Sequence, residues 1–99
     1  MPPMAKTALI IDDDATFRAM HRMAVGKSDF KREDIKEVVD GVSGLAAMKA
    51  NLYDVVLSDY EMPEMDGLAM IQAFRVWEAG QGRRPRPTIL IGHLHHGGQ

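Results

Sequence analysis

Acidic residues stand directly after two short apolar runs in this sequence. Asp12 and Asp13 follow the run 8–11, and Asp59 follows the run 54–58. Continuous apolar runs of this length are typical of strands that are buried on both faces of a parallel sheet. The carboxyl ends of parallel strands share one edge of the sheet, where open α/β folds keep their sites. We therefore expect the side chains of Asp12, Asp13 and Asp59 to lie close together.

Three carboxylates at one edge repel one another unless a cation lies among them. Two like charges about 4 Å apart repel by roughly 4 kcal/mol at an effective dielectric constant of about 20. Oxygen ligands without a soft partner select hard ions, so we predict Mg²⁺ at Asp12, Asp13 and Asp59, with Mn²⁺ or Ca²⁺ as substitutes. A carboxylate beside Mg²⁺ can attack a phosphoryl group and form an aspartyl phosphate, with catalysis coming mainly from positioning and charge neutralisation.

A simpler interpretation assigns these acids no shared role. The triplet 12–14 would then be a solvated turn with a helix cap, and Asp59 would be a loop residue after a strand. Short acidic motifs often arise by chance, which favours this interpretation for the triplet alone. Two acidic strand ends, together with the Met62-Pro63 turn, favour the metal site instead.

Apolar periodicity predicts strands that alternate with helices. Strands are expected at residues 7–11, 35–39, 54–58 and 88–91, and helices at 15–27, 43–50 and 68–79. Alternation of this kind implies right-handed βαβ units and a parallel sheet. The buried face of the first helix should contain Phe17, Met20 and Ala24. Arg18 and Arg22 are expected nearer to solvent.

Composition indicates one globular domain. A chain of 99 residues is enough for a single domain, and a hydrophobic fraction of 45% argues against disorder. The net charge of −2 provides no basic field for nucleic acid. No stretch reaches the length of a membrane span, and residues 1–6 contain no apolar core of a secretory signal. The absence of cysteine fits a cytoplasmic protein.

Two motifs resemble the receiver domain of two-component response regulators. They are the segment 9–14 (LIIDDD) and the segment 59–67 (DYEMPEMDG), and an Asp40-Gly41 turn follows the second expected strand as it does in that family. The resemblance covers about residues 7–91, so a receiver domain is expected at residues 1–91. It implies a flavodoxin-like, doubly wound α/β fold with an incomplete parallel sheet of about four strands in the order 2-1-3-4.

The resemblance also implies a role for each acidic residue. Asp59 would be the phosphoacceptor. Asp13 and Asp59 would bind Mg²⁺ directly, and Glu61 would bind it through its backbone carbonyl. Asp12 would act directly or through water. The chain would be a stand-alone module of a phosphorelay, a phosphoacceptor rather than an enzyme, which reacts weakly with small-molecule donors. Its partner would be a histidine kinase or a phosphotransfer protein.

The sequence departs from the family at its C-terminal end. The family has Ser or Thr at the end of the fourth strand, where Gly92 stands here, and a lysine at the end of a fifth strand that this sequence does not include. That lysine contacts the phosphoryl group through a charge-assisted hydrogen bond of about 1.5–3 kcal/mol. The departure predicts a truncated receiver domain in which switching is impaired.

Two other functions compete with this prediction. The departures at the C-terminal end favour a pseudo-receiver, which is a protein-interaction and dimerisation element that keeps the fold but does not switch. The pattern Asp12-x-Asp14-x-Thr16 formally fits a metal-dependent phosphohydrolase with its nucleophile on the first strand. The phosphohydrolase alternative leaves the segment 59–67 unexplained. Reaction with a small-molecule phosphodonor would separate the first two functions.

The C-terminal part of the sequence predicts self-association. Without a fifth strand, the fourth would be an edge strand that presents Ile89, Leu90 and Ile91, and exposed edges pair readily, so a homodimer is expected. Residues 92–99 indicate a flexible tail rich in His and Gly, whose histidines could alternatively chelate Zn²⁺ or Ni²⁺. The basic stretch 81–87 is expected to be a solvated linker rather than a nucleic-acid contact.

Overall fold

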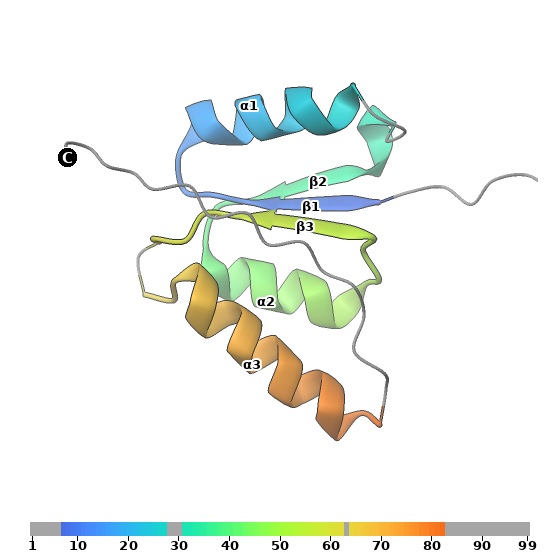
Figure 1. Ribbon diagram of the computed structural model, residues 1–99, viewed down its shortest axis with the longest axis vertical. Coiled ribbons are helices and arrows are strands. Elements are labelled where there is room, and N and C mark those ends of the chain that lie inside the picture. The colour runs from blue at the N-terminus through green and yellow to red at the C-terminus, as the bar shows by residue number, and fades with distance from the viewer. Residues whose placement is uncertain (1–6, 28–30, 63, 83–99) are drawn as a thin grey trace, which may run out of the picture.

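Helices cover both faces of a parallel sheet (Figure 1). This computed structural model describes residues 7–27, 31–62 and 64–82. Its elements in order are β1 (Ala8–Ile11), α1 (Ala15–Gly26), the short 3-10 helix η1 (Arg32–Asp34), β2 (Ile35–Val38), α2 (Gly41–Ala50), β3 (Val55–Ser58) and α3 (Gly67–Gly80). The expected strand at 88–91 with Ile89, Leu90 and Ile91, and the tail at 92–99, lie outside the described residues. Within the described ranges, no helix has both the length and the apolar character needed to cross a bilayer.

The sheet has the strand order β2-β1-β3, and both pairs are parallel. The register places Ala8 of β1 opposite Ile35 and Val55, and Ile11 opposite Val38 and Ser58. Every residue of β1 is fully buried, which explains why its sequence is a continuous apolar run rather than an alternating one. The expected flavodoxin-like fold class is confirmed, with the strand order 2-1-3 in the described part.

The core has one apolar cluster on each face of the sheet, because successive strand residues point to opposite faces. α1 covers one face, and α2 and α3 cover the other (Figure 1). The cluster under α1 consists of Ala8, Ile10, Val25 and Leu57. The cluster on the opposite face joins β1 and β3 to the two other helices, and includes Leu9, Ile11, Ala47, Met48, Val56, Met62, Met70 and Phe74.

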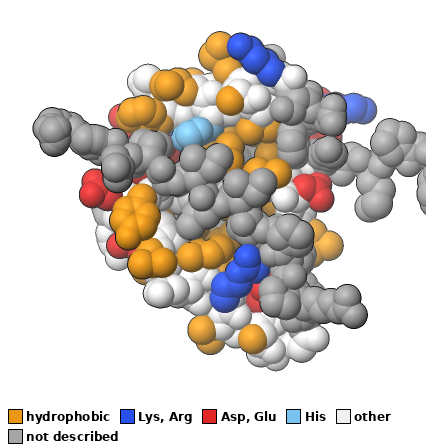
Figure 2. Space-filling view, viewed as in Figure 1, with side chains coloured by type: hydrophobic (Ala, Val, Ile, Leu, Met, Phe, Trp, Pro, Cys, Tyr) orange, Lys and Arg blue, Asp and Glu red, His pale blue; other side chains and the backbone are white. Residues whose placement is uncertain are grey.

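The buried face of α1 differs from the prediction. Met20 is 55% exposed and Ala24 is exposed, whereas Val25 is buried. Apolar side chains are visible accordingly on the outer surface of α1, at the top of Figure 2. Successive helical residues are rotated by about 100° around the helix axis. The buried face of α1 therefore lies about one residue further around the helix than predicted, on the side of Arg18 and Val25. Arg18 is 19% exposed and faces the sheet edge, so the prediction that it lies nearer to solvent was wrong.

Aspartates cap the three α-helices in the described part of the chain. Asp14 accepts hydrogen bonds from the backbone N–H groups of Thr16 and Phe17 at the start of α1, and Asp66 accepts from that of Ala69 at the start of α3. In these positions a carboxylate satisfies N–H groups that have no partner inside the helix. The caps explain why α2 begins at Gly41, two residues before its predicted start, and why α3 begins at Gly67, one residue before its predicted start.

Asp40 caps α2, and this cap should make stability depend on pH. Its Oδ1 accepts a hydrogen bond of 2.7 Å from the Ser43 backbone N–H, and that bond lowers the pKa of Asp40 below its usual value. The stabilisation is present above the unfolded-state pKa and is lost as pH falls through the lower folded-state pKa. We expect Asp40→Ala to lower Tm at neutral pH and to have a smaller effect at strongly acidic pH. Asp40→Asn, which retains a capping oxygen, should lower Tm less, as thermal melts across pH would show.

Candidate metal centre

Three carboxylates meet at the carboxyl edge of the sheet. Asp12 and Asp13 follow β1 and Asp59 follows β3, and each offers a carboxylate oxygen within 4.8 Å of the others. Asp12 and Asp59 are fully buried, while Asp13 is exposed. Backbone hydrogen bonds of the sheet continue past the strand ends, since the Asp12 N–H donates to Val38 O and the Asp59 N–H donates to Ile11 O. The sheet therefore fixes the positions from which these side chains leave the backbone.

Two local hydrogen bonds orient the buried carboxylates. The Asp14 backbone N–H donates to Asp12 Oδ1 at 2.9 Å, and the Glu61 backbone N–H donates to Asp59 Oδ1 at 3.2 Å. Glu61 itself is exposed. Its N–H thus contributes to the site, while the expected contact of its carbonyl with a metal stays a prediction.

The chemistry of the donor set fits a hard divalent cation. All three ligand groups are carboxylates, and they gather close enough for one ion to contact each of them. Two buried acids with a third beside them repel strongly at low local dielectric, so a divalent cation would stabilise the arrangement. An oxygen-only set is the type that Mg²⁺ prefers, and the exposed Asp13 leaves one side open for the waters that Mg²⁺ retains.

The start of α3 packs against the backbone of Asp59. A Cβ atom added at Gly67 would lie 2.6 Å from the Asp59 carbonyl oxygen. The Gly67 N–H donates to Tyr60 O at 2.9 Å, and the Ser58 hydroxyl donates to Asp59 O at 2.8 Å. These contacts hold the peptide that follows Asp59, so Gly67 and Ser58 belong to the framework of the site. From the sequence, Gly67 was noted only as the last residue of the segment 59–67, without a structural role.

The loop before α3 also packs against α2. A Cβ atom added at Gly41 would overlap the Met65 carbonyl oxygen, so only a glycine fits there without displacement of the loop. Glu64 has a φ of 68°, a left-handed conformation that turns the chain toward this contact. The loop before α3 and the start of α2 are therefore in close contact at the Met65 backbone and Gly41.

Arg18 contacts the loop that carries Asp12, which the sequence did not indicate. Its Nη1 donates to the Asp12 carbonyl oxygen at 2.8 Å, and its Nε lies 3.5 Å from Glu37 Oε1. The second oxygen of Glu37 lies 3.3 Å from Nε of Arg22. An ion-pair network between α1 and β2 thus adjoins the acidic group.

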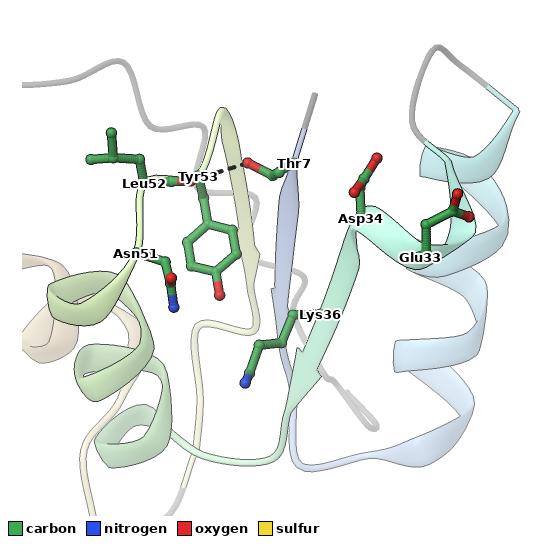
Figure 3. Close-up of a pocket in the computed structure, with 7 residues that line it drawn as sticks. All are labelled: Thr7, Glu33, Asp34, Lys36, Asn51, Leu52 and Tyr53. Carbon is green, nitrogen blue, oxygen red and sulfur yellow. Dashed lines mark hydrogen bonds between the residues drawn. The ribbon is translucent and has the colours of Figure 1, made fainter. Parts of the chain in front are cut away.

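A separate cavity of about 280 Å³ lies at the opposite edge of the sheet (Figure 3). It is lined by Thr7, Glu33, Asp34, Lys36, Asn51, Leu52 and Tyr53, so it shares no residue with the acidic group. Burial raises the pKa of Tyr53 above its ordinary value. The lining contains charges of both signs and does not indicate one class of ligand.

The third competing function finds no support in the position of Asp14. As a phosphohydrolase acid, this residue would have to face the reacting group with Asp12. Its Oδ1 instead accepts from Thr16 and Phe17 backbone N–H groups, at 2.8 and 3.2 Å, as the cap of α1. The acidic group consists of Asp12, Asp13 and Asp59.

Comparison with known proteins places the whole described core in one family. Residues 8–91 match the family model of the response regulator receiver domain. The chain is 34% identical over 90 residues to a protein-glutamate methylesterase/protein-glutamine glutaminase of Agrobacterium fabrum, a match that covers 91% of this chain and 24% of that protein. It is 37% identical over 67 residues to a probable chemotaxis protein CheY of Rhizobium etli, covering 68% and 50% respectively. The matches span half or less of these curated relatives.

Solved structures agree with this assignment. The signal receiver domain of NarL from Mycobacterium tuberculosis has a TM-score of 0.72 and 31% identity, with 95% of this chain and 71% of that chain covered. A chain in the complex of the histidine kinase ThkA with the response regulator protein TrrA also has a TM-score of 0.72, at 22% identity, covering 95% of this chain and 74% of that one. The latter match shows a shared fold.

Proposed function

This chain belongs to the response regulator receiver domain family, and from that membership we propose that it accepts a phosphoryl group on Asp59 in two-component signalling. Mg²⁺ would be held by Asp12, Asp13 and Asp59, with the backbone carbonyl of Glu61 as a further ligand. The observation that carries the proposal is the acidic group itself, whose carboxylate oxygens lie within 4.8 Å of one another at the carboxyl edge of the sheet.

The residues around Asp59 suit it to nucleophilic attack. The Glu61 N–H orients Asp59 Oδ1 at 3.2 Å, and the Asp59 carboxylate lies within 4.8 Å of the Asp12 and Asp13 oxygens that would hold Mg²⁺. In the transfer, a carboxylate oxygen of Asp59 bonds to phosphorus while the bond from phosphorus to the donor breaks, and the donor keeps that electron pair. Bound Mg²⁺ would neutralise charge on the phosphoryl oxygens. The chain's own contribution is to fix the position and orientation of the Asp59 carboxylate beside Asp12 and Asp13.

The donor in this proposal is a histidine kinase or a phosphotransfer protein. The complex of ThkA with TrrA pairs a histidine kinase with a response regulator, and this chain shares the fold of a chain in that complex. The chain would receive the group rather than turn over a substrate, so its role is that of a phosphoacceptor that also reacts with small-molecule donors.

Mg²⁺ binding gives the first test. Affinity should lie in the millimolar range, because a few carboxylates leave Mg²⁺ with most of its waters. Titration of the parent chain, followed by amide NMR, should shift resonances near Asp12, Asp13 and Asp59 first. Asp13→Asn should weaken binding by at least about tenfold, and Asp54→Asn at the opposite edge should leave it unchanged. Equal titration of the parent and Asp13→Asn would remove the metal site.

Phosphoryl transfer gives the second test. The parent chain incubated with acetyl phosphate and Mg²⁺ should gain the mass of one phosphoryl group, and chelation of Mg²⁺ should suppress the gain. A chain that binds Mg²⁺ but never gains this mass would instead support the non-switching interaction element. The two measurements therefore separate a metal site from a phosphoacceptor.

A further inference from the structure

Arg18 links the loop that carries the acidic group to the edge strand β2. Its Nη1 donates to the Asp12 carbonyl oxygen at 2.8 Å, and its Nε lies 3.5 Å from Glu37 Oε1. The side chain is only 19% exposed, so this contact is partly shielded from water. We propose that Arg18 is a positioning residue of the metal centre, which sets the orientation of Asp12 and Asp13 without touching the ion. The inference rests on the function proposed above.

Helix geometry explains how Arg18 reaches a residue before its own helix. Helical side chains lean toward the N-terminus of the helix, so a long side chain in the second turn of α1 extends back over the preceding loop. The orientation of α1 that leaves Met20 exposed also places Arg18 over the end of β1. The orientation of this helix and the geometry of the acidic group are therefore coupled.

The hydrogen bond from Arg18 to the Asp12 carbonyl oxygen affects the positions of both Asp12 and Asp13. The Asp12 carbonyl and the Asp13 N–H belong to one planar peptide unit, so fixing the carbonyl also fixes the position of the Asp13 Cα, from which the Asp13 side chain leaves the backbone. Asp12 is held from the other side, where its Oδ1 accepts from the Asp14 N–H at 2.9 Å.

Glu37 in turn fixes Arg18. Its Oε1 pairs with Arg18 and its Oε2 pairs with Arg22 at 3.3 Å, so the carboxylate is held between two guanidinium groups. Glu37 would act on the metal centre through Arg18, because, of Arg18, Arg22 and Glu37, only Arg18 contacts Asp12. Arg22 supplies a matched control, since it makes an ion pair on the same helix and is not bonded to Asp12.

The test compares Arg18→Ala, Arg18→Lys, Glu37→Gln and Arg22→Ala in the full chain. Loss of a residue that orients metal ligands typically weakens metal affinity by about tenfold or more. We expect the Kd for Mg²⁺ to rise about tenfold in Arg18→Ala and to recover partly in Arg18→Lys. It should change less than about twofold in Arg22→Ala, since surface ion pairs contribute little. Adding Glu37→Gln to Arg18→Ala should cause no further loss, because the two act through one contact.

A second readout does not depend on metal. The Asp13 amide shares its peptide unit with the Asp12 carbonyl, so its nitrogen chemical shift without Mg²⁺ should move in Arg18→Ala and stay in place in Arg22→Ala. Arg18→Lys supplies both readouts if Arg18→Ala fails to fold. Equal Mg²⁺ affinities and equal Asp13 shifts in the Arg18 and Arg22 variants would overturn the inference and leave the proposed function intact. A parent chain that binds no Mg²⁺ would overturn the proposed function and, with it, this role of Arg18.

Discussion

Asp59→Asn is expected to abolish uptake of the phosphoryl group. The substitution keeps the size of the side chain and an oxygen that can accept from the Glu61 N–H, but it removes the nucleophilic carboxylate. It also removes one charge from a group of three acids within 4.8 Å, so the variant should be no less stable than the parent. Intact mass after incubation with acetyl phosphate and Mg²⁺ should show the phosphoryl group on the parent alone.

Asp54→Asn is the matched control for this prediction. Asp54 lies at the opposite edge of the sheet, where its carboxylate accepts from the Thr7 N–H at 2.8 Å. The control should be phosphorylated as fully as the parent. If the Asp59→Asn variant gained phosphoryl groups at the parent's rate, another residue would be the nucleophile.

Gly41→Ala is expected to destabilise the fold strongly. A Cβ atom there would overlap the Met65 carbonyl oxygen, and that neighbour is backbone, which cannot rotate away as a flexible side chain can. Overpacking of this kind costs about 3 kcal/mol, a large part of the stability of a small domain. Relief of the overlap would have to move the loop that leads into α3, which also holds the peptide after Asp59. Urea unfolding would measure the loss directly.

Gly26→Ala controls for the intrinsic effect of replacing a helical glycine. A Cβ atom at Gly26, the last residue of α1, would meet nothing within 4 Å. This substitution should be neutral or stabilising by about 0.5–1 kcal/mol, because alanine favours helix more than glycine does. If Gly41→Ala were as stable as Gly26→Ala, the start of α2 would not be packed against the loop before α3 as described.

The position of the acidic group could be predicted because it depends on local pattern and sheet topology alone. The apolar runs before Asp12 and Asp59 identify buried parallel strands, and parallel strands deliver their last residues to one edge. The structure brings these two acids and Asp13 together as expected. Fold class and strand order followed from the same alternation of strands and helices, together with the family motifs.

Several contacts that hold the site were not predictable, because they depend on how the helices and loops pack in the folded chain. The buried face of α1 includes Arg18, which reaches Asp12 and Glu37, whereas periodicity predicted the face with Met20. Gly41 shows the same limit: its requirement for glycine arises from Met65, which only the folded chain brings near. Backbone approach leaves no periodic signal in a sequence.

Locating the phosphoryl group on the chain tests the central claim most directly. A variant can lose phosphorylation through an indirect effect of the substitution. Borohydride instead reduces an aspartyl phosphate to homoserine and so marks the phosphorylated residue itself. Peptide mass spectrometry of the parent, phosphorylated with Mg²⁺ and then reduced, should find homoserine at position 59 and aspartate at positions 12 and 13. Homoserine at another position, or none after a phosphoryl group has been gained, would contradict the account.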